Sequence, residues 1–141
     1  MQTFISDSEA ETGRIAQEIC KKIPSGSLVL FTGDMGAGKT TFMRGALQAY
    51  GNDAFVSSPT FALVNDYGGD PHIYHFDMYR VDSVEDLFST GFFDYLGADS
   101  ILFVEWSENI RSFLSPPFFE IDIAKTPAET QRIITVKGSG F

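Results

Sequence analysis

Hydrophobic positions in the first fifty residues predict a helix, a buried strand and a second helix. After Ser8, apolar residues at positions 15, 16, 19, 20 and 23 recur at helical spacing, and Pro24 ends the pattern. Residues 27–32 contain a continuous apolar run, which is typical of a strand covered on both faces in a parallel sheet. Glycines follow this strand directly, and a helix is then expected over residues 39–50.

The rest of the chain predicts five more strands and a short helix. Residues 61–67 and 72–77 alternate around a turn cluster at 68–71, a pattern typical of a hairpin. Ser83, followed three residues later by Asp86, is typical of a helix N-terminus, and Gly91 is a plausible end. A second buried strand is expected at 100–106. Two closing strands, 118–124 and 132–137, are joined by a polar turn.

Glycines between the buried strand and the second helix form a phosphate-loop motif. Residues 33–40 read Gly, four residues, Gly, Lys, Thr, in the strand–loop–helix context that this motif requires. Three of these glycines allow positive φ, so that successive amide groups point inward around an anion. The helix start adds unpaired amides and the positive end of its dipole. The predicted nucleotide-binding residues of this loop are Gly33, Asp34, Met35, Gly36, Ala37, Gly38, Lys39, Thr40 and Thr41.

The nucleotide is expected to be ATP with Mg²⁺. Lys39 supplies a charge for the β- and γ-phosphates, the Thr40 hydroxyl is placed to hold Mg²⁺, and Thr41 can reach the α-phosphate. No Asn-Lys-x-Asp motif for reading guanine is present, which favours ATP. We therefore predict an α/β, single-domain P-loop NTPase-like three-layer fold over residues 1–141, with a mixed, largely parallel central sheet.

Two acidic residues that end strands are candidates for the other half of the site. Asp77 closes the segment 72–77, and Glu105 closes a buried run, so both can emerge at the sheet edge where the phosphate loop lies. Hydrolysis needs an acid to anchor the hydrated Mg²⁺ and a group that orients a water. Spacing alone does not decide which acid holds the metal.

Four further features have both a functional and a purely structural interpretation. The cluster Ser57-Ser58-Pro59-Thr60 is either a loop that places Thr60 near the γ-phosphate or a plain turn. His75 shares a strand face with Asp77, and is either its supporting partner or a structural histidine. Trp106 either flanks the nucleotide or a partner protein, or belongs to the core, and Arg80 either contacts phosphate or forms a surface ion pair.

Composition narrows the class of function. Nineteen acidic against ten basic residues give a net charge of −9, and the bases are scattered along the chain, which disfavours direct nucleic-acid binding and favours a basic partner protein. The single cysteine, Cys20, excludes an internal disulfide and a cysteine metal cluster, and is expected in the core. No apolar run approaches the roughly 20 residues that span a bilayer, and no signal core is present. We expect a soluble, cytoplasmic protein.

Four motifs together closely resemble the bacterial TsaE (YjeE) family. They are the phosphate loop at 33–41, Ser-Pro-Thr-Phe at 58–61, His-Phe-Asp-Met-Tyr-Arg at 75–80 and Val-Glu-Trp at 104–106. The phosphate loop is shared by many NTPases, whereas the four motifs in this order are much more specific. Residues 107–141 carry no motif of the family that we recognise.

The resemblance implies an ATPase that serves formation of the threonylcarbamoyl group on adenosine 37 of tRNAs reading codons that begin with adenine. It implies that ATP binding and hydrolysis act on a complex of TsaD and TsaB, which contacts the tRNA. It also implies catalytic roles for Lys39, Asp77 and Glu105, with Asp77 on Mg²⁺ and Glu105 positioning or activating the attacking water. The remaining implied roles are a metal site of Thr40, Asp77 and Glu105, a nucleotide-sensing switch at Ser58, Pro59 and Thr60, and a nucleotide-binding position at Thr12.

Two other functions are compatible with a phosphate loop. A small P-loop kinase would need an acceptor pocket and usually an arginine-bearing lid, but residues 81–110 contain neither Lys nor Arg. A nucleotide-gated binding module would bind partners with ATP while hydrolysing almost none.

Overall fold

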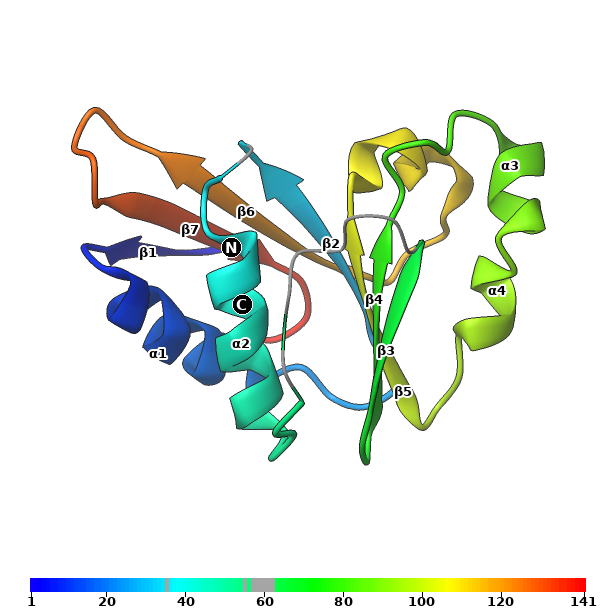
Figure 1. Cartoon of the computed structure of the whole chain (residues 1–141), viewed down its shortest axis with the longest axis horizontal. Helices are drawn as coiled ribbons and strands as arrows, with labels where there is room; N and C mark the ends of the chain where they lie inside the picture. Colours follow the sequence, from blue (N-terminus) through cyan, green and yellow to red (C-terminus); the bar gives the residue numbers. More distant parts are fainter. Residues whose placement is uncertain (35, 55, 57–62) are drawn as a thin grey trace.

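The computed structural model describes residues 1–34, 36–54, 56 and 63–141, and its helices and strands follow the predicted order closely (Figure 1). Within these residues the strands are β1 (Gln2–Ser6), β2 (Leu28–Gly33), β3 (Val64–Gly68), β4 (His72–Asp77), β5 (Ser100–Glu105), β6 (Phe119–Lys125) and β7 (Arg132–Lys137). The helices are α1 (Glu9–Cys20), α2 (Lys39–Ala49), α3 (Val84–Ser89) and α4 (Phe92–Tyr95), with two short 3₁₀ helices at Ser107–Asn109 and Arg111–Phe113.

All seven described strands join one sheet in the order β1-β7-β6-β2-β5-β4-β3. The four middle strands, β6, β2, β5 and β4, are parallel to their neighbours among themselves. The outer pairs, β1 with β7, β7 with β6, and β3 with β4, are antiparallel. The prediction of an α/β fold with a mixed sheet is confirmed, and the parallel part is its centre.

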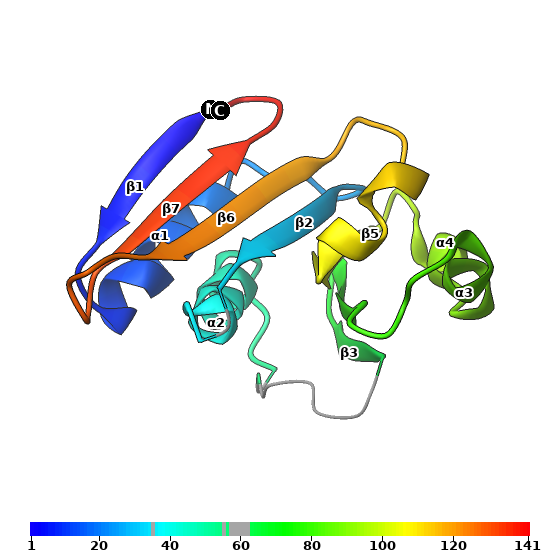
Figure 2. The ribbon, with the colours of Figure 1, turned by 90° about the horizontal axis from the view of Figure 1, so that it is seen from above.

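Helices cover the sheet on both faces and produce two separate cores. Val29 and Phe31 of β2 pack with the buried residues of α1 and α2, including Cys20. Leu28 and Leu30, which alternate with them and so point to the opposite face, pack with Leu87 of α3 and other apolar side chains. Seen from above, α1 and α2 lie together on one side of the sheet (Figure 2). This is the expected three-layer arrangement.

Capping residues that the sequence analysis identified lie at the starts of two helices. The Ser8 hydroxyl accepts from the Glu11 amide at the start of α1, and the Ser83 hydroxyl accepts from the Asp86 amide at the start of α3. Gly91 has a φ of +75°, but four helical residues, α4, follow it, which the sequence analysis did not expect. Residues 61 and 62 of the predicted hairpin lie outside the described residues, and the remainder of that hairpin forms β3 and β4.

Strand β1 is also an element that the sequence analysis missed. It is short, its first two residues are exposed, and it pairs along its whole length with β7 at the far end of the chain. Phe141 ends beside it, where its carbonyl oxygen accepts from the Met1 ammonium at 2.8 Å, and Figure 2 shows the two termini side by side. No helix in the described part of the chain is long and apolar enough to cross a bilayer.

Helices α1 and α2 approach each other closely at Gly45, which has consequences for stability. A Cβ at Gly45 would lie 2.4 Å from the Gly13 carbonyl oxygen and 2.8 Å from the Ala16 Cβ. We therefore expect Gly45→Ala to lower the free energy of unfolding by about 1–3 kcal/mol, the usual cost of overpacking, when measured by urea denaturation.

Gly13→Ala is the matched control for this prediction. Gly13 is also inside a helix, and apart from its chain neighbours and its own helix backbone no atom of the described residues lies within 4 Å of the position of its Cβ. Alanine should therefore stabilise the chain by about 0.5–1 kcal/mol through helix propensity. Equal effects of the two substitutions would contradict the close helix contact.

Candidate functional site

The phosphate loop has the backbone conformation that its glycines permit. The φ angles are +130° at Gly33, +74° at Gly36 and +110° at Gly38, values that strongly favour glycine. At Gly33 a Cβ would lie 2.1 Å from the Ile123 carbonyl oxygen, so the approach of β6 also excludes a side chain there. Met35 of the predicted site lies outside the described residues. Positive φ angles thus explain the glycines at 33, 36 and 38, and at Gly33 the lack of room for a Cβ is a second reason.

Helix α2 begins at this loop with no side-chain cap. Its N-cap residue is Gly38, which has no side chain to accept from the first amides. The first amide N–H groups of a helix have no hydrogen-bond acceptor within the helix, and the positive end of the helix dipole lies at the same place. A bound anion can therefore take the place of the missing cap. Lys39, Thr40 and Thr41 form this first turn, next to Gly38 and the exposed Asp34.

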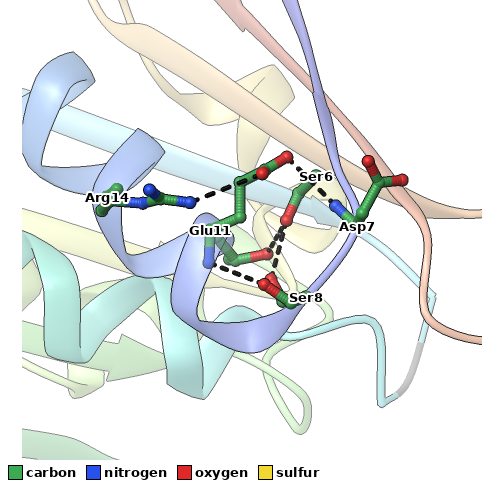
Figure 3. A network of polar contacts seen from close by, with 6 residues as sticks. Ser6, Asp7, Ser8, Glu11 and Arg14 are labelled. Carbon is green, nitrogen blue, oxygen red and sulfur yellow. Dashed lines mark hydrogen bonds and ion pairs between the residues drawn. The ribbon is translucent and has the colours of Figure 1, made fainter.

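A cleft of about 410 Å³ lies beside the loop and contains Thr12. Gly36, Gly38 and Thr41 line it from the loop side, and the start of α1 lines it from the other. The Thr12 side chain is buried, and its hydroxyl lies 2.7 Å from the Ser6 hydroxyl. Figure 3 shows the polar network that fixes this helix start, in which the Ser6 hydroxyl donates to the Ser8 carbonyl oxygen at 2.8 Å. The cleft brings Thr12 and the phosphate loop together.

Asp77 and Glu105 lie side by side at the carboxyl ends of β4 and β5. They are directly paired in the parallel register, and the Met78 amide donates to the Glu105 carbonyl oxygen at 3.0 Å. Strand β5 also pairs with β2, and the Ser107 hydroxyl donates to the Phe31 carbonyl oxygen at 2.7 Å. Because parallel strands end at one edge, both carboxyl groups lie at the edge from which the phosphate loop leaves the sheet.

A contact between Lys39 and Trp106 joins the phosphate loop to the end of β5. The Lys39 Nζ lies 5.9 Å from the centre of the Trp106 ring, within the range of a cation–π contact. Trp106 directly follows β5 and has a φ of +57°, the only positive φ of a non-glycine residue in the described chain. Its ring contacts the exposed Tyr79 edge-on, with 4.9 Å between the centroids. Trp106 is half-buried at the site rather than part of the deep core.

His75 contacts Glu105 and not Asp77. Its side chain is 1% exposed, and its Nε2 lies 3.0 Å from the Glu105 Oε2. On the other side of the ring, Nδ1 lies 3.4 Å from the Tyr67 hydroxyl. Burial raises the pKa of the Glu105 carboxyl, but contact with His75 and the charge on Lys39 together outweigh burial, so this pKa lies below its ordinary value. Glu105 is therefore ionised at neutral pH.

The oxygen donors at this edge fit Mg²⁺. Mg²⁺ is usually held by one or two carboxylates, with phosphate oxygens and water completing its shell. Asp77 and Glu105 supply carboxylates at the strand ends, and Thr40 supplies a hydroxyl in the first turn of α2. Among the described residues, no three His, Cys, Asp or Glu side chains gather into a ready metal site. These donors would need further oxygen ligands, such as phosphate or water, to complete the shell of Mg²⁺.

Of the remaining predicted residues, the structure describes only Arg80. Ser58, Pro59 and Thr60 lie outside the described residues, as does Ser57. Arg80 is exposed, and no ion pair involves it among the described residues.

Two basic residues near the loop were missed from the sequence. The Lys125 Nζ lies 3.5 Å from the position that a Cβ would take on Gly36, and Arg132 lines the cleft. Both lie at the β6–β7 hairpin, where they are paired in register. No local pattern distinguishes them from other surface bases. Although the bases are scattered in sequence, the fold thus brings Lys39, Lys125 and Arg132 to one loop.

Comparison with known proteins extends the likeness from residues 33–106 to nearly the whole chain. The model of the family described as "Threonylcarbamoyl adenosine biosynthesis protein TsaE" matches residues 6–134. The tRNA threonylcarbamoyladenosine biosynthesis protein TsaE of Rickettsia typhi is 36% identical over 137 residues, covering 96% of this chain and 94% of that protein. The Bacillus subtilis protein of the same name is 34% identical over 132 residues, covering 92% and 81%.

A solved structure agrees with these relatives. The crystal structure of Bacillus subtilis YdiB matches this chain with a TM-score of 0.74 and 27% sequence identity. The match covers 99% of this chain and 86% of that one.

Removing the His75 imidazole should raise the pKa of Glu105. In His75→Leu the carboxyl stays buried, while the contact that favours its ionised form is lost. The lowered pKa of folded Glu105 stabilises the wild-type chain above the ordinary carboxyl range, and this advantage is lost as pH falls through the folded pKa. A ¹³C NMR titration of the Glu105 carboxyl should show the shift directly.

His72→Leu is the control, because His72 is the only other histidine and contacts Asp66 instead. It should leave the pKa of Glu105 unchanged. A pKa of Glu105 that is equal in wild type and His75→Leu would show that the contact does not control its ionisation.

Proposed function

The chain belongs to the TsaE family of tRNA threonylcarbamoyladenosine biosynthesis proteins, and from this we propose that it is a Mg²⁺-dependent ATPase acting on a complex of TsaD and TsaB. Its ATP binding and hydrolysis serve formation of the threonylcarbamoyl group on adenosine 37 of tRNAs reading codons that begin with adenine. We place this activity in the cytoplasm. The observation that carries the proposal is the phosphate loop facing the adjacent carboxyl groups of Asp77 and Glu105.

Binding of the triphosphate rests on the loop and on the start of α2. Positive φ angles at Gly36 and Gly38 curve the backbone so that amide groups can surround an anion. Lys39 leaves the Trp106 ring for the β- and γ-phosphates, an exchange that charge attraction favours. The nucleoside then occupies the cleft that contains Thr12 and Thr41.

Mg²⁺ is assigned to the Thr40 hydroxyl and the Asp77 carboxylate, with Glu105 close by. When bound with ATP, it neutralises the charge that develops on the transferred phosphoryl group. Asp77 suits this role because its Oδ1 accepts from the Tyr79 amide at 2.9 Å, which orients the carboxylate at the strand end. This outer contact is of the kind that orients metal ligands.

Glu105 is the residue that orients the attacking water. Its carboxylate is ionised, so it can accept a hydrogen bond from water. One of its oxygens, Oε2, also contacts the buried His75 imidazole. Lys39 lies near enough for its charge to lower the pKa of Glu105, which places the carboxylate beside the expected phosphates. Water positioning in such ATPases is often incomplete until a partner is bound.

Partner dependence is supported by charge. A net charge of −9 opposes direct contact with tRNA phosphates, and the basic side chains at the loop are few. The chain therefore acts on tRNA through TsaD and TsaB, which contact the nucleic acid.

Lys39→Ala should weaken MgATP binding by at least tenfold, because the loop loses its only cation within the helix's first turn. Titration with a fluorescent ATP analogue measures this loss. Lys137→Ala, at an exposed position on β7, is the control and should bind as wild type. Equal affinity of all three proteins would mean that the loop is not the phosphate site.

Glu105→Gln should keep MgATP binding but reduce partner-stimulated hydrolysis by about 10²–10⁴-fold, because the amide cannot take up a proton from water. Phosphate release is measured with wild type and variant, each alone and with TsaD and TsaB. Glu108→Gln, an exposed acid of the following 3₁₀ helix, should retain full activity. Normal turnover by Glu105→Gln would remove its assigned role, and ATP-dependent partner binding without any turnover would indicate a nucleotide-gated binding module.

A further inference from the structure

Arg132 makes an unusual set of contacts for a residue at the start of an edge-proximal strand. Its Nε donates to the Ala37 carbonyl oxygen of the phosphate loop at 3.0 Å. Its Nη1 donates to the carbonyl oxygens of Glu129 at 2.8 Å and Gln131 at 2.9 Å. The first contact joins residues 95 positions apart, while the other two are local. One guanidinium group thus links the phosphate loop to the turn before β7.

Ala37 is the point at which the phosphate loop is held. It lies between Gly36 and Gly38, both of which have positive φ. Its side chain is 1% exposed within the core beneath α1 and α2, and its amide donates to the Asp34 carbonyl oxygen at 3.1 Å. The carbonyl oxygen is held by Arg132. Both backbone polar groups and the methyl group of this residue are therefore fixed.

The same contacts define the shape of the neighbouring cleft. The cleft has three walls, which are the start of α1, the phosphate loop and the turn before β7. Arg132 joins the second wall to the third. Gln131, the residue before it, donates through Nε2 to the Asp7 Oδ1 at 3.3 Å and so joins the third wall to the first. A movement of the turn before β7 would therefore change both the conformation of the phosphate loop and the shape of the cleft.

Glycine-rich loops lose much conformational freedom when they order around an anion. A loop that is already held in the binding conformation avoids part of this cost, which raises affinity without any new contact to the ligand. Arg132 is well suited to hold it, because a guanidinium is always charged and donates from a rigid planar fork. A lysine has one compact donor group and cannot reproduce contacts to the loop and the turn with the same geometry.

We propose that Arg132 is a positioning residue, which holds the phosphate loop in its binding conformation from the β6–β7 hairpin. This proposal rests on the proposed function for its effect on ATP. The hydrogen bond from Arg132 to the Ala37 carbonyl oxygen is itself present in the chain without nucleotide. Arg132 acts through the Ala37 carbonyl group, and so it should influence how tightly nucleotide binds far more than how fast bound ATP is hydrolysed.

The test compares wild type with Arg132→Met and Arg132→Lys. Arg14→Met is the control, because the Arg14 side chain is 71% exposed and its one ion pair among the described residues is with Glu11 on its own helix. Hydrogen exchange of the peptide covering residues 33–38 is measured without nucleotide. MgADP affinity is measured through the fluorescence of Trp106, the only tryptophan, and KM and kcat for ATP are measured with partners present.

Arg132→Met should exchange faster at residues 33–38, and its Kd for MgADP and KM for ATP should rise about tenfold, the usual effect of losing one charged hydrogen bond. Its kcat should stay within about threefold of wild type, since Asp77 and Glu105 are untouched. Arg132→Lys should show intermediate exchange and affinity. Should Arg132→Met fail to fold, Arg132→Lys alone decides, because it keeps the charge and loses the fork.

Two results would overturn the proposal. Wild-type exchange and affinity in Arg132→Met would show that the loop needs no brace. Full wild-type behaviour of Arg132→Lys would show that charge alone matters. Failure of the proposed function is distinguishable from both. A wild-type chain that binds no nucleotide would refute the ATPase, while the exchange of residues 33–38 would still show whether Arg132 holds the loop.

Discussion

Parallel pairing of β2, β5 and β4 is the constraint on which the rest of the site depends. Because these strands run in one direction, the segments that leave their carboxyl ends meet at one edge. The phosphate loop, Glu105 and Asp77 are neighbours for this reason, although they are far apart in sequence. Both faces of these strands are covered by apolar side chains, as is typical of a parallel sheet. The same packing that stabilises the chain therefore positions its polar groups.

Local patterns in the sequence were enough to predict α1, β2, the loop and α2, because caps, apolar spacing and glycines act within a few residues. They also identified Asp77 and Glu105 as strand ends, but their direct pairing depends on the register of β4 with β5. Strand β1 was missed because its partner lies at the other end of the chain. Arg132 was missed for the same reason, since its contact with Ala37 spans most of the chain.

The local charge at this edge of the sheet differs from the net charge of the chain. The chain is strongly acidic, yet Lys39, Lys125 and Arg132 gather around the loop. The charge on Lys39 also helps to lower the pKa of the Glu105 carboxyl. A polyphosphate would be attracted to this edge while nucleic acid is repelled by the rest of the surface. Family membership and geometry thus support one account, in which the chain uses ATP and leaves tRNA contacts to partners.

A crystal structure of the chain with Mg²⁺ and a non-hydrolysable ATP analogue tests the central claim most directly. The account predicts phosphates surrounded by the amides of Gly36 and residues 38–41, with the Lys39 ammonium moved from Trp106 to the phosphates. It also predicts Mg²⁺ beside Thr40 and Asp77, with the nucleoside in the cleft that contains Thr12. An analogue bound elsewhere, or a phosphate loop left empty at saturating nucleotide, would contradict the account.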